Sequence, residues 1–304
     1  MLIPYLYTCV FPHLGHLTST VATFITRFYC YYTTSPLFAH TTRLCIYTPK
    51  QREGENRVPG VLWIHGGGYV MGSATMAIPY AEKLIEAEEC VVVAPDYTLS
   101  IDKPFPASLL DNYTALLWLN LHADELGIRN DQIFVGGDSA GGGLAVALAL
   151  YARDKDEVKI AFQMPLYPML DDRMTSASMK DNDAPMWNEH ANRIGWRLYL
   201  GELFGSEQVP AYAAPARETN YSGLPPAFTF VGTLDPFRDE TVGYIENLQA
   251  AGVDAELHEY EGCYHAFDQA NPKTDKSWDA MNRLLLAFQN AVAHCYAKQY
   301  SAPL

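Results

Sequence analysis

A serine with glycines on both sides stands where an apolar run meets a run of small residues. Residues 137–141 read Gly-Asp-Ser-Ala-Gly, with Ser139 after the β-forming run 132–135 and before a helix-forming segment, residues 140–153. Glycines have no Cβ, so a strand and a helix can approach closely at a sharp turn that strains the serine backbone. A hydroxyl on such a turn, near the positive end of a helix, is typical of a nucleophile. A glycine-rich helix start that only packs tightly is the alternative.

A serine hydroxyl attacks a carbonyl only when a base removes its proton. In a strand–serine–helix arrangement, the acid and the histidine follow later in the chain, in loops after strands. Among the histidines after residue 235, His258 lies in an alternating strand-like run and His294 in a predicted helix. His265 lies in a loop just after a strand-like run. We therefore predict His265 as the general base, with a structural loop histidine as the alternative.

An aspartate follows the apolar run 228–231 at the point where an acid is expected. Asp235 is followed by Pro236, which suits the first turn of a helix over residues 237–251. Asp235 could then be the N-cap of that helix, and it could also orient the imidazole and stabilise its protonated form. The two roles need not exclude each other. Asp239 falls inside the predicted helix and is interpreted as a first-turn charge.

Three consecutive glycines, residues 66–68, follow the short apolar run 61–64. Such a run is entropically costly unless the backbone itself must approach something. The amides of these glycines, with the amide of Ala140, could face the oxyanion that develops at a carbonyl under attack. We predict that His65 anchors this loop through hydrogen bonds. A phosphate-binding loop is the alternative, but it lacks the lysine and Ser/Thr that should follow.

The composition and charge of the chain indicate its size class and exclude several kinds of partner. The chain has 304 residues, of which 49% are hydrophobic, enough for one large core. Its net charge of −14 opposes nucleic acid and anionic membranes, so we expect neither as a partner. Six cysteines are scattered without a close pair, which is typical of a reduced, cytoplasmic protein. His13 and His16 lack carboxylate or cysteine neighbours, so no metal is predicted.

The N-terminal segment is uncharged and aromatic. The first 26 residues contain no Lys, Arg, Asp or Glu, so a targeting or spanning segment is one interpretation. A basic start is missing, and Pro4, Pro12 and Gly15 interrupt the apolar character, which favours a packed segment. The aromatic side chains of residues 1–40 need to be covered by the body of the domain or by a second subunit. A homodimer is therefore considered.

Apolar runs alternate with helical patterns along most of the chain. The predicted strands are 42–48, 61–64, 91–93, 132–135, 158–164, 228–231 and 255–260. The predicted helices are 74–89, 107–123, 140–153, 187–200, 237–251 and 274–298. Short, continuously apolar strands separated by helices predict an α/β fold with a mostly parallel sheet covered on both faces.

A polar excursion, residues 171–215, interrupts this alternation and is interpreted as a cap or lid. Residues 1–42 are assigned to a second cap element, and the whole chain, 1–304, is predicted as a single domain. Four apolar residues of the excursion could line a pocket for an acyl or alcohol group: Met179, Met186, Trp187 and Trp196. Ordinary packing is the alternative for most of them.

These motifs together resemble the hormone-sensitive-lipase-like family of α/β-hydrolase carboxylesterases. The resemblance runs from Arg43 to the C-terminus and rests on residues 65–68, 96–97, 104–107, 137–142, 224–226, 235–236 and 265–267. It implies an α/β-hydrolase fold with a small cap. It also implies a catalytic triad of Ser139, Asp235 and His265. The amides of Gly67, Gly68 and Ala140 would form the oxyanion hole.

The resemblance implies a serine carboxylesterase that acts on small, short-acyl esters through an acyl-enzyme, with no cofactor. The same triad could hydrolyse amides or lactones. A non-catalytic ligand-binding protein on this fold would be expected to lack a triad member, and none is missing. Two stretches depart from the family pattern: residues 98–102, where the family usually has Arg-Leu-Ala-Pro-Glu, and residues 1–40, which do not resemble its usual helical cap.

Overall fold

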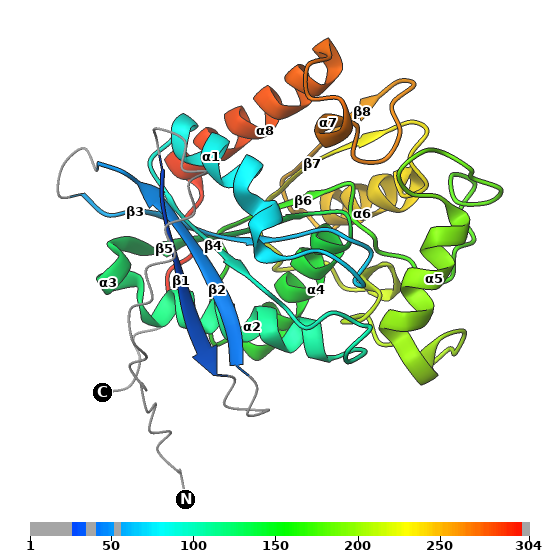
Figure 1. Cartoon of the computed structure of the whole chain (residues 1–304), viewed down its shortest axis with the longest axis horizontal. Helices are drawn as coiled ribbons and strands as arrows, with labels where there is room; N and C mark the ends of the chain where they lie inside the picture. Colours follow the sequence, from blue (N-terminus) through cyan, green and yellow to red (C-terminus); the bar gives the residue numbers. More distant parts are fainter. Residues whose placement is uncertain (1–25, 35–40, 52–55, 300–304) are drawn as a thin grey trace, which may run out of the picture.

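The computed structural model describes residues 26–34, 41–51 and 56–299 (Figure 1). Their eight strands form one sheet in the order β1-β2-β4-β3-β5-β6-β7-β8. The strands are β1 Thr26–Thr34, β2 Thr41–Pro49, β3 Val58–Ile64, β4 Val91–Pro95, β5 Ile128–Asp138, β6 Phe162–Leu166, β7 Ala227–Gly232 and β8 Ala255–Tyr260. Strands β3 to β8 pair in parallel, whereas β1 and β2 are antiparallel to their neighbours. The predicted mostly parallel sheet is confirmed.

Helices cover both faces of this sheet. They are α1 Ile78–Ala87, α2 Ala107–Leu121, α3 Ala123–Leu126, α4 Ala140–Lys155, α5 Glu189–Leu200, α6 Arg238–Ala250, α7 Phe267–Ala270 and α8 Asp275–His294. Three 3₁₀ turns accompany them: η1 Ala74–Ala77, η2 Gly201–Leu203 and η3 Pro215–Arg217. Residues of α2, α4 and α6 belong to one buried hydrophobic cluster, and residues of α1 and α8 belong to the other. The sheet therefore separates two cores.

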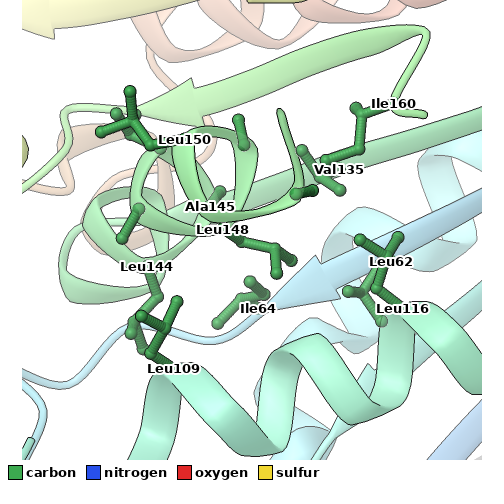
Figure 2. Packing of buried hydrophobic residues seen from close by; sticks show 14 of the residues in the cluster. Leu62, Ile64, Leu109, Leu116, Val135, Leu144, Ala145, Leu148, Leu150 and Ile160 are labelled. Carbon is green, nitrogen blue, oxygen red and sulfur yellow. The ribbon is translucent and has the colours of Figure 1, made fainter. Parts of the chain in front are cut away.

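Successive side chains of β3 point to opposite faces of the sheet, so the strand contributes residues to both cores. Leu62 and Ile64 face α2 and α4, where Figure 2 shows them beside the leucines of those helices. Val61 and Trp63 belong to the opposite cluster, and the Trp63 ring stacks on Tyr80 of α1 with centroids 4.4 Å apart. Because β3 lies between β4 and β5, the loops that follow β3 and β5 emerge side by side.

Helix α4 is apolar on almost every side. Its residues from Ala140 to Leu150 and Ala152 are buried. A helix of this kind needs cover all round. It packs on β5 and β6 and is covered by α2 and η3. The element that begins directly after Ser139 is therefore fixed within the core.

The ladder that joins β6 to β7 is much sparser than its neighbours. A single residue pair, Gln163 with Ala227, registers β6 against β7, whereas five pairs join β5 to β6 and six join β7 to β8. Side chains support this seam. The Gln163 amide donates to the carbonyl of Pro225, at 2.8 Å, and Thr229 Oγ1 donates to the carbonyl of Pro165, at 2.5 Å.

The described part of residues 1–42 belongs to the sheet and does not form a cap, which corrects that assignment. Residues 26–34 form the edge strand β1, and β2 begins at residue 41. Alternation places the Phe28 ring against Tyr47 on one face and the Tyr31 ring against Trp118 of α2 on the other. Edge pairing thus gives these aromatic side chains partners. Residues 1–25 and 35–40 lie outside the described residues.

The excursion 171–215 runs between β6 and β7 and carries α5 and η2. Its buried Tyr199 stacks on Tyr69, just after the glycines of the β3 loop, with centroids 3.9 Å apart. The side chain of Asn188 caps α5 by accepting from the amide of Ala191, at 3.1 Å. In the ranges the structure describes, no helix has the length and apolarity that a membrane span requires.

Candidate active site

Ser139 forms a strained turn between the last residue of β5 and the first residue of α4. Its backbone has φ 57° and ψ −120°, a conformation rare for a residue with a side chain. A Cβ added to Gly141 would meet the backbone carbonyl of Ile64, and one added to Gly137 would meet the same carbonyl at 2.5 Å. The glycines around the serine are therefore required by close backbone approach.

Three side chains that are distant in sequence meet at this turn. His265 Nε2 lies 2.8 Å from Ser139 Oγ, and His265 Nδ1 lies 2.8 Å from Asp235 Oδ2. All three residues are buried. A carboxylate can only accept, so Nδ1 carries the hydrogen and Nε2 is left to accept the hydroxyl proton. The structure thus brings together the three residues predicted as a triad.

Asp235 lies in the turn between β7 and α6. Its Oδ1 accepts from the amide of Phe237, at 2.9 Å, while Oδ2 faces the imidazole. The interpretation of Asp235 as a helix N-cap is wrong, because α6 begins at Arg238 and its N-cap is Phe237. Pro236 belongs to this turn and precedes the helix. Asp239 is in the first turn of α6, as expected, and accepts from the amide of Ser178 in the excursion 171–215, at 2.9 Å.

Two aromatic rings hold the imidazole of His265 edge-on. Tyr167 and Phe237 each lie with their ring centroids 5.0 Å from that of the imidazole, at interplanar angles of 74° and 87°. His265 itself is in the loop after β8, and Ala266 beside it has φ 54°. These two aromatic contacts restrict rotation of the buried imidazole.

The glycine loop after β3 exposes backbone amides near the serine turn. Gly67 has φ 117° and Gly68 has φ 60°, and the Gly67 carbonyl accepts from the amides of Val70 and Met71. Within the described residues, the amides of Gly67, Gly68 and Ala140 donate no backbone hydrogen bond. Ala140 is the first residue of α4, where amides have no partner within the helix.

His65 lies at the base of this loop and is buried. Its Nδ1 donates to the carbonyl of Gly66, at 2.7 Å, and its ring stacks on Tyr97 with centroids 4.2 Å apart. The Tyr97 hydroxyl donates to the His65 carbonyl, at 3.0 Å. Burial lowers the pKa of His65, which favours a neutral ring. These contacts are those of an anchor.

Residues 98–102, which depart from the family pattern, have partners of their own. The amide of Thr98 donates to Asp111 Oδ2, and the amide of Ser100 donates to the carbonyl of Tyr69, both at 2.8 Å. The stretch is therefore tied to α2 and to the end of the glycine loop without the family's arginine.

The four apolar residues predicted to line a pocket have different surroundings. Met179 and Trp196 are buried in the core, and Met186 is 63% exposed. The Trp187 ring lies against Gly68, because a Cβ added there would meet the indole. The indole nitrogen of Trp187 donates to Asn192 Oδ1, at 3.1 Å, which fixes the ring. Trp187 thus contacts Gly68 itself, and Trp196 packs on Tyr69 at the end of the loop, with ring centroids 5.5 Å apart.

Two carboxyls near the site, the buried Asp138 and the half-buried Glu240, had no sequence signal of their own. Asp138 is buried, and its Oδ2 accepts from Gln269 Nε2 at 3.2 Å. Glu240 accepts from the amides of Leu170 and Asp171, where the excursion 171–215 begins. Burial and the charge of Asp171 raise the pKa of Glu240. Asp138 is part of the serine motif, but nothing in that motif indicates its surroundings.

The sheet and the serine turn with its histidine and aspartate define the class of α/β hydrolases. A family model described as "alpha/beta hydrolase fold" matches residues 61–269. The chain belongs to this family, within its hormone-sensitive-lipase-like group. In the described part of the chain, no cluster of three or more His, Cys, Asp or Glu side chains could hold a metal ion.

Esterases are among the similar proteins. The chain is 34% identical over 245 residues to "Esterase LipI" of Mycobacterium tuberculosis, covering 80% of this chain and 76% of that protein. It is 32% identical over 240 residues to "Carboxylesterase NlhH" of the same species, covering 78% and 75%. A solved structure named "Bacterial Heroin Esterase" has a TM-score of 0.85 at 34% identity, covering 90% of this chain and 87% of that one.

Proposed function

We propose that this chain, a serine carboxylesterase, cleaves esters through an acyl-enzyme formed on Ser139. The observation that carries the proposal is the continuous contact from Ser139 Oγ through His265 to Asp235, with 2.8 Å at each step. As Oγ attacks the ester carbonyl, His265 Nε2 takes the hydroxyl proton and then gives it to the leaving alcohol. Water next attacks the acyl group, with His265 again as the base.

Charge develops on the carbonyl oxygen in both steps. We assign its stabilisation to the amides of Gly67, Gly68 and Ala140, which donate no backbone hydrogen bond in the described chain. Loss of one such donor typically costs about 10²–10³-fold in turnover. Asp235 keeps Nδ1 protonated and stabilises the imidazolium. His65 holds the glycine loop.

The proposed substrates are small esters with short acyl chains. The Trp187 indole against Gly68 supports this choice, because it fills space beside the proposed oxyanion hole. A series of nitrophenyl esters from acetate to laurate tests it, and turnover that rises toward laurate would reject it. An anilide and a lactone in the same series measure amidase and lactonase activity.

The mechanism is tested on nitrophenyl acetate with Ser139→Ala, which should abolish hydrolysis while the fold survives. Ser108→Ala, at another buried serine on α2, is the control and should remain active. An organophosphate should add one adduct to the peptide that contains Ser139. Retained turnover in Ser139→Ala, or an adduct on another peptide, would reject the mechanism.

A cytoplasmic location and a homodimer belong to the same proposal. The five cysteines of the described residues are free thiols, which supports a reducing compartment. Light scattering on the purified chain would decide between a monomer and a dimer.

A further inference from the structure

A buried hydrogen-bonded cluster is formed by Tyr80, Tyr167, Asp268 and Gln269. It lies beside His265 and has no part in the mechanism above. The Tyr80 hydroxyl donates to Asp268 Oδ2 and the Tyr167 hydroxyl to Asp268 Oδ1, both at 2.9 Å. Gln269 Nε2 lies 2.9 Å from the Tyr80 oxygen and 3.1 Å from the Tyr167 oxygen. Both tyrosines and Asp268 are buried. We call this group the tyrosine–aspartate cluster.

The cluster touches both halves of the proposed catalytic machinery. The Tyr167 ring packs edge-on against the imidazole of His265. Gln269 Nε2 reaches Asp138 Oδ2, at 3.2 Å, and Asp138 directly precedes the nucleophile in the chain. Asp268 and Gln269 lie on α7, just after the histidine loop. One cluster therefore links the serine turn to the loop that carries the base.

Ordinary packing does not account for this arrangement. Asp138 and Asp268 are both buried, and within the described residues neither carboxyl forms an ion pair with a lysine or arginine. Burying carboxyls in this way costs free energy. Tyr167 also has φ 34°, a strained backbone for a tyrosine. Destabilising features of this kind persist only where the surrounding structure compensates for them, and they are concentrated at functional sites.

We propose that Asp268 is a positioning residue for the histidine. By accepting from both tyrosine hydroxyls, Asp268 fixes the Tyr167 ring that limits rotation of the imidazole. The tyrosines that Asp268 fixes also contact the Gln269 amide, which in turn contacts Asp138. These contacts hold α7, and with it the histidine loop, against the serine turn. The substrate touches none of these groups. The inference rests on the proposed roles of Ser139 and His265.

The test measures kcat and KM for nitrophenyl acetate in Asp268→Ala and Tyr167→Phe. Misplacement of a catalytic group by about 1 Å can cost about 10²-fold in rate, so we expect kcat to fall about 10–100-fold. KM should change little, because the groups that meet substrate are unchanged. The rate at which an organophosphate reacts with Ser139 should fall in parallel with kcat.

The matched control is Tyr113→Phe. It removes another buried tyrosine hydroxyl, which donates to Glu157 Oε2 at 2.7 Å and belongs to neither the triad nor the cluster. Its melting temperature should fall while kcat remains. If Asp268→Ala lowers the melting temperature as the control does and leaves kcat intact, Asp268 is only structural and the proposal is wrong.

Asp268→Asn separates geometry from charge. An asparagine can accept from the Tyr167 hydroxyl and donate to the Tyr80 oxygen, while Tyr80 donates to Tyr167 across 2.9 Å. The bridge would survive, so we expect most of the activity lost in Asp268→Ala to be restored. An asparagine variant as impaired as the alanine variant would overturn the proposal.

Two further results complete the test. If Asp268→Ala does not fold, Tyr80→Phe and Tyr167→Phe decide, because each removes one arm of the bridge. An unchanged kcat in both phenylalanine variants would overturn the proposal. Ser139→Ala, assayed alongside, reports on the mechanism separately. If it is inactive while Asp268→Ala has full activity, only the role of Asp268 is refuted.

Discussion

Asp138→Asn should stabilise the protein above neutral pH and lose that advantage in acid. Burial and, less strongly, the nearby charge of Asp268 raise the pKa of Asp138 from 3.8 to about 6, against the opposing effect of the hydrogen bond from Gln269. The carboxyl is enclosed, since a Cβ added to Gly66 would meet it. Ionisation of the buried Asp138 therefore destabilises the native state.

The size and sign of the effect follow from proton linkage. A shift from 3.8 to about 6 is worth about 3 kcal/mol, at 1.36 kcal/mol for each pKa unit. Above pH 6 the native state holds an ionised, buried Asp138 and bears the full cost. As pH falls through 6 toward 3.8, the native state binds the proton first and the cost disappears. Asparagine never ionises, so its advantage over the native residue should shrink over this window.

The assay is urea unfolding of both proteins, followed by tryptophan fluorescence from about pH 5 to about pH 8. The asparagine amide hydrogens need acceptors, which adds an offset that does not depend on pH and leaves the slope unchanged. Asp183→Asn, at an exposed cap aspartate, controls for the substitution itself. A stability difference between Asp138→Asn and the native protein that stays constant across this range would refute the reasoning.

Two other substitutions test the loop and the cap. In Gly67→Ala, the φ of 117° and the backbone carbonyl of Met71 leave no room for a Cβ, so kcat on nitrophenyl acetate should fall about 10²–10³-fold. Unchanged turnover would exclude the Gly67 amide from the site. Arg217→Met leaves the buried Asp172 without its two-pronged partner and should cost about 3–5 kcal/mol in urea unfolding. Arg193→Met, at an exposed ion pair, should cost much less; equal losses would contradict the argument.

The residues that we propose for the chemistry could be picked out from the sequence because their signals are local. Glycines around Ser139 reflect close backbone approach at that turn. His265 could be separated from two other histidines because only it falls in a loop after a strand. The order of strands and helices followed from hydrophobic patterns, since parallel strands are buried on both faces.

The ends of the strands, and the contacts between residues far apart in the sequence, could not be found in this way. The strand predicted over 158–164 is β6, Phe162–Leu166, because its pairing with β5 starts only at Phe162. Residues 26–34 had no clear period, since their aromatic side chains lie on both faces of an edge strand. The tyrosine–aspartate cluster joins Tyr80 to Asp268 across 188 residues, and each of them alone resembles an ordinary helical residue.

The sparse seam between β6 and β7 runs between the residues of the proposed triad. Ser139 follows β5 on one side, whereas Asp235 and His265 follow β7 and β8 on the other. If the pairing between β6 and β7 opened, few backbone hydrogen bonds would break, yet His265 would be separated from Ser139. Catalytic competence should therefore be the first property to be lost under mild denaturation, while most of the molecule is still native.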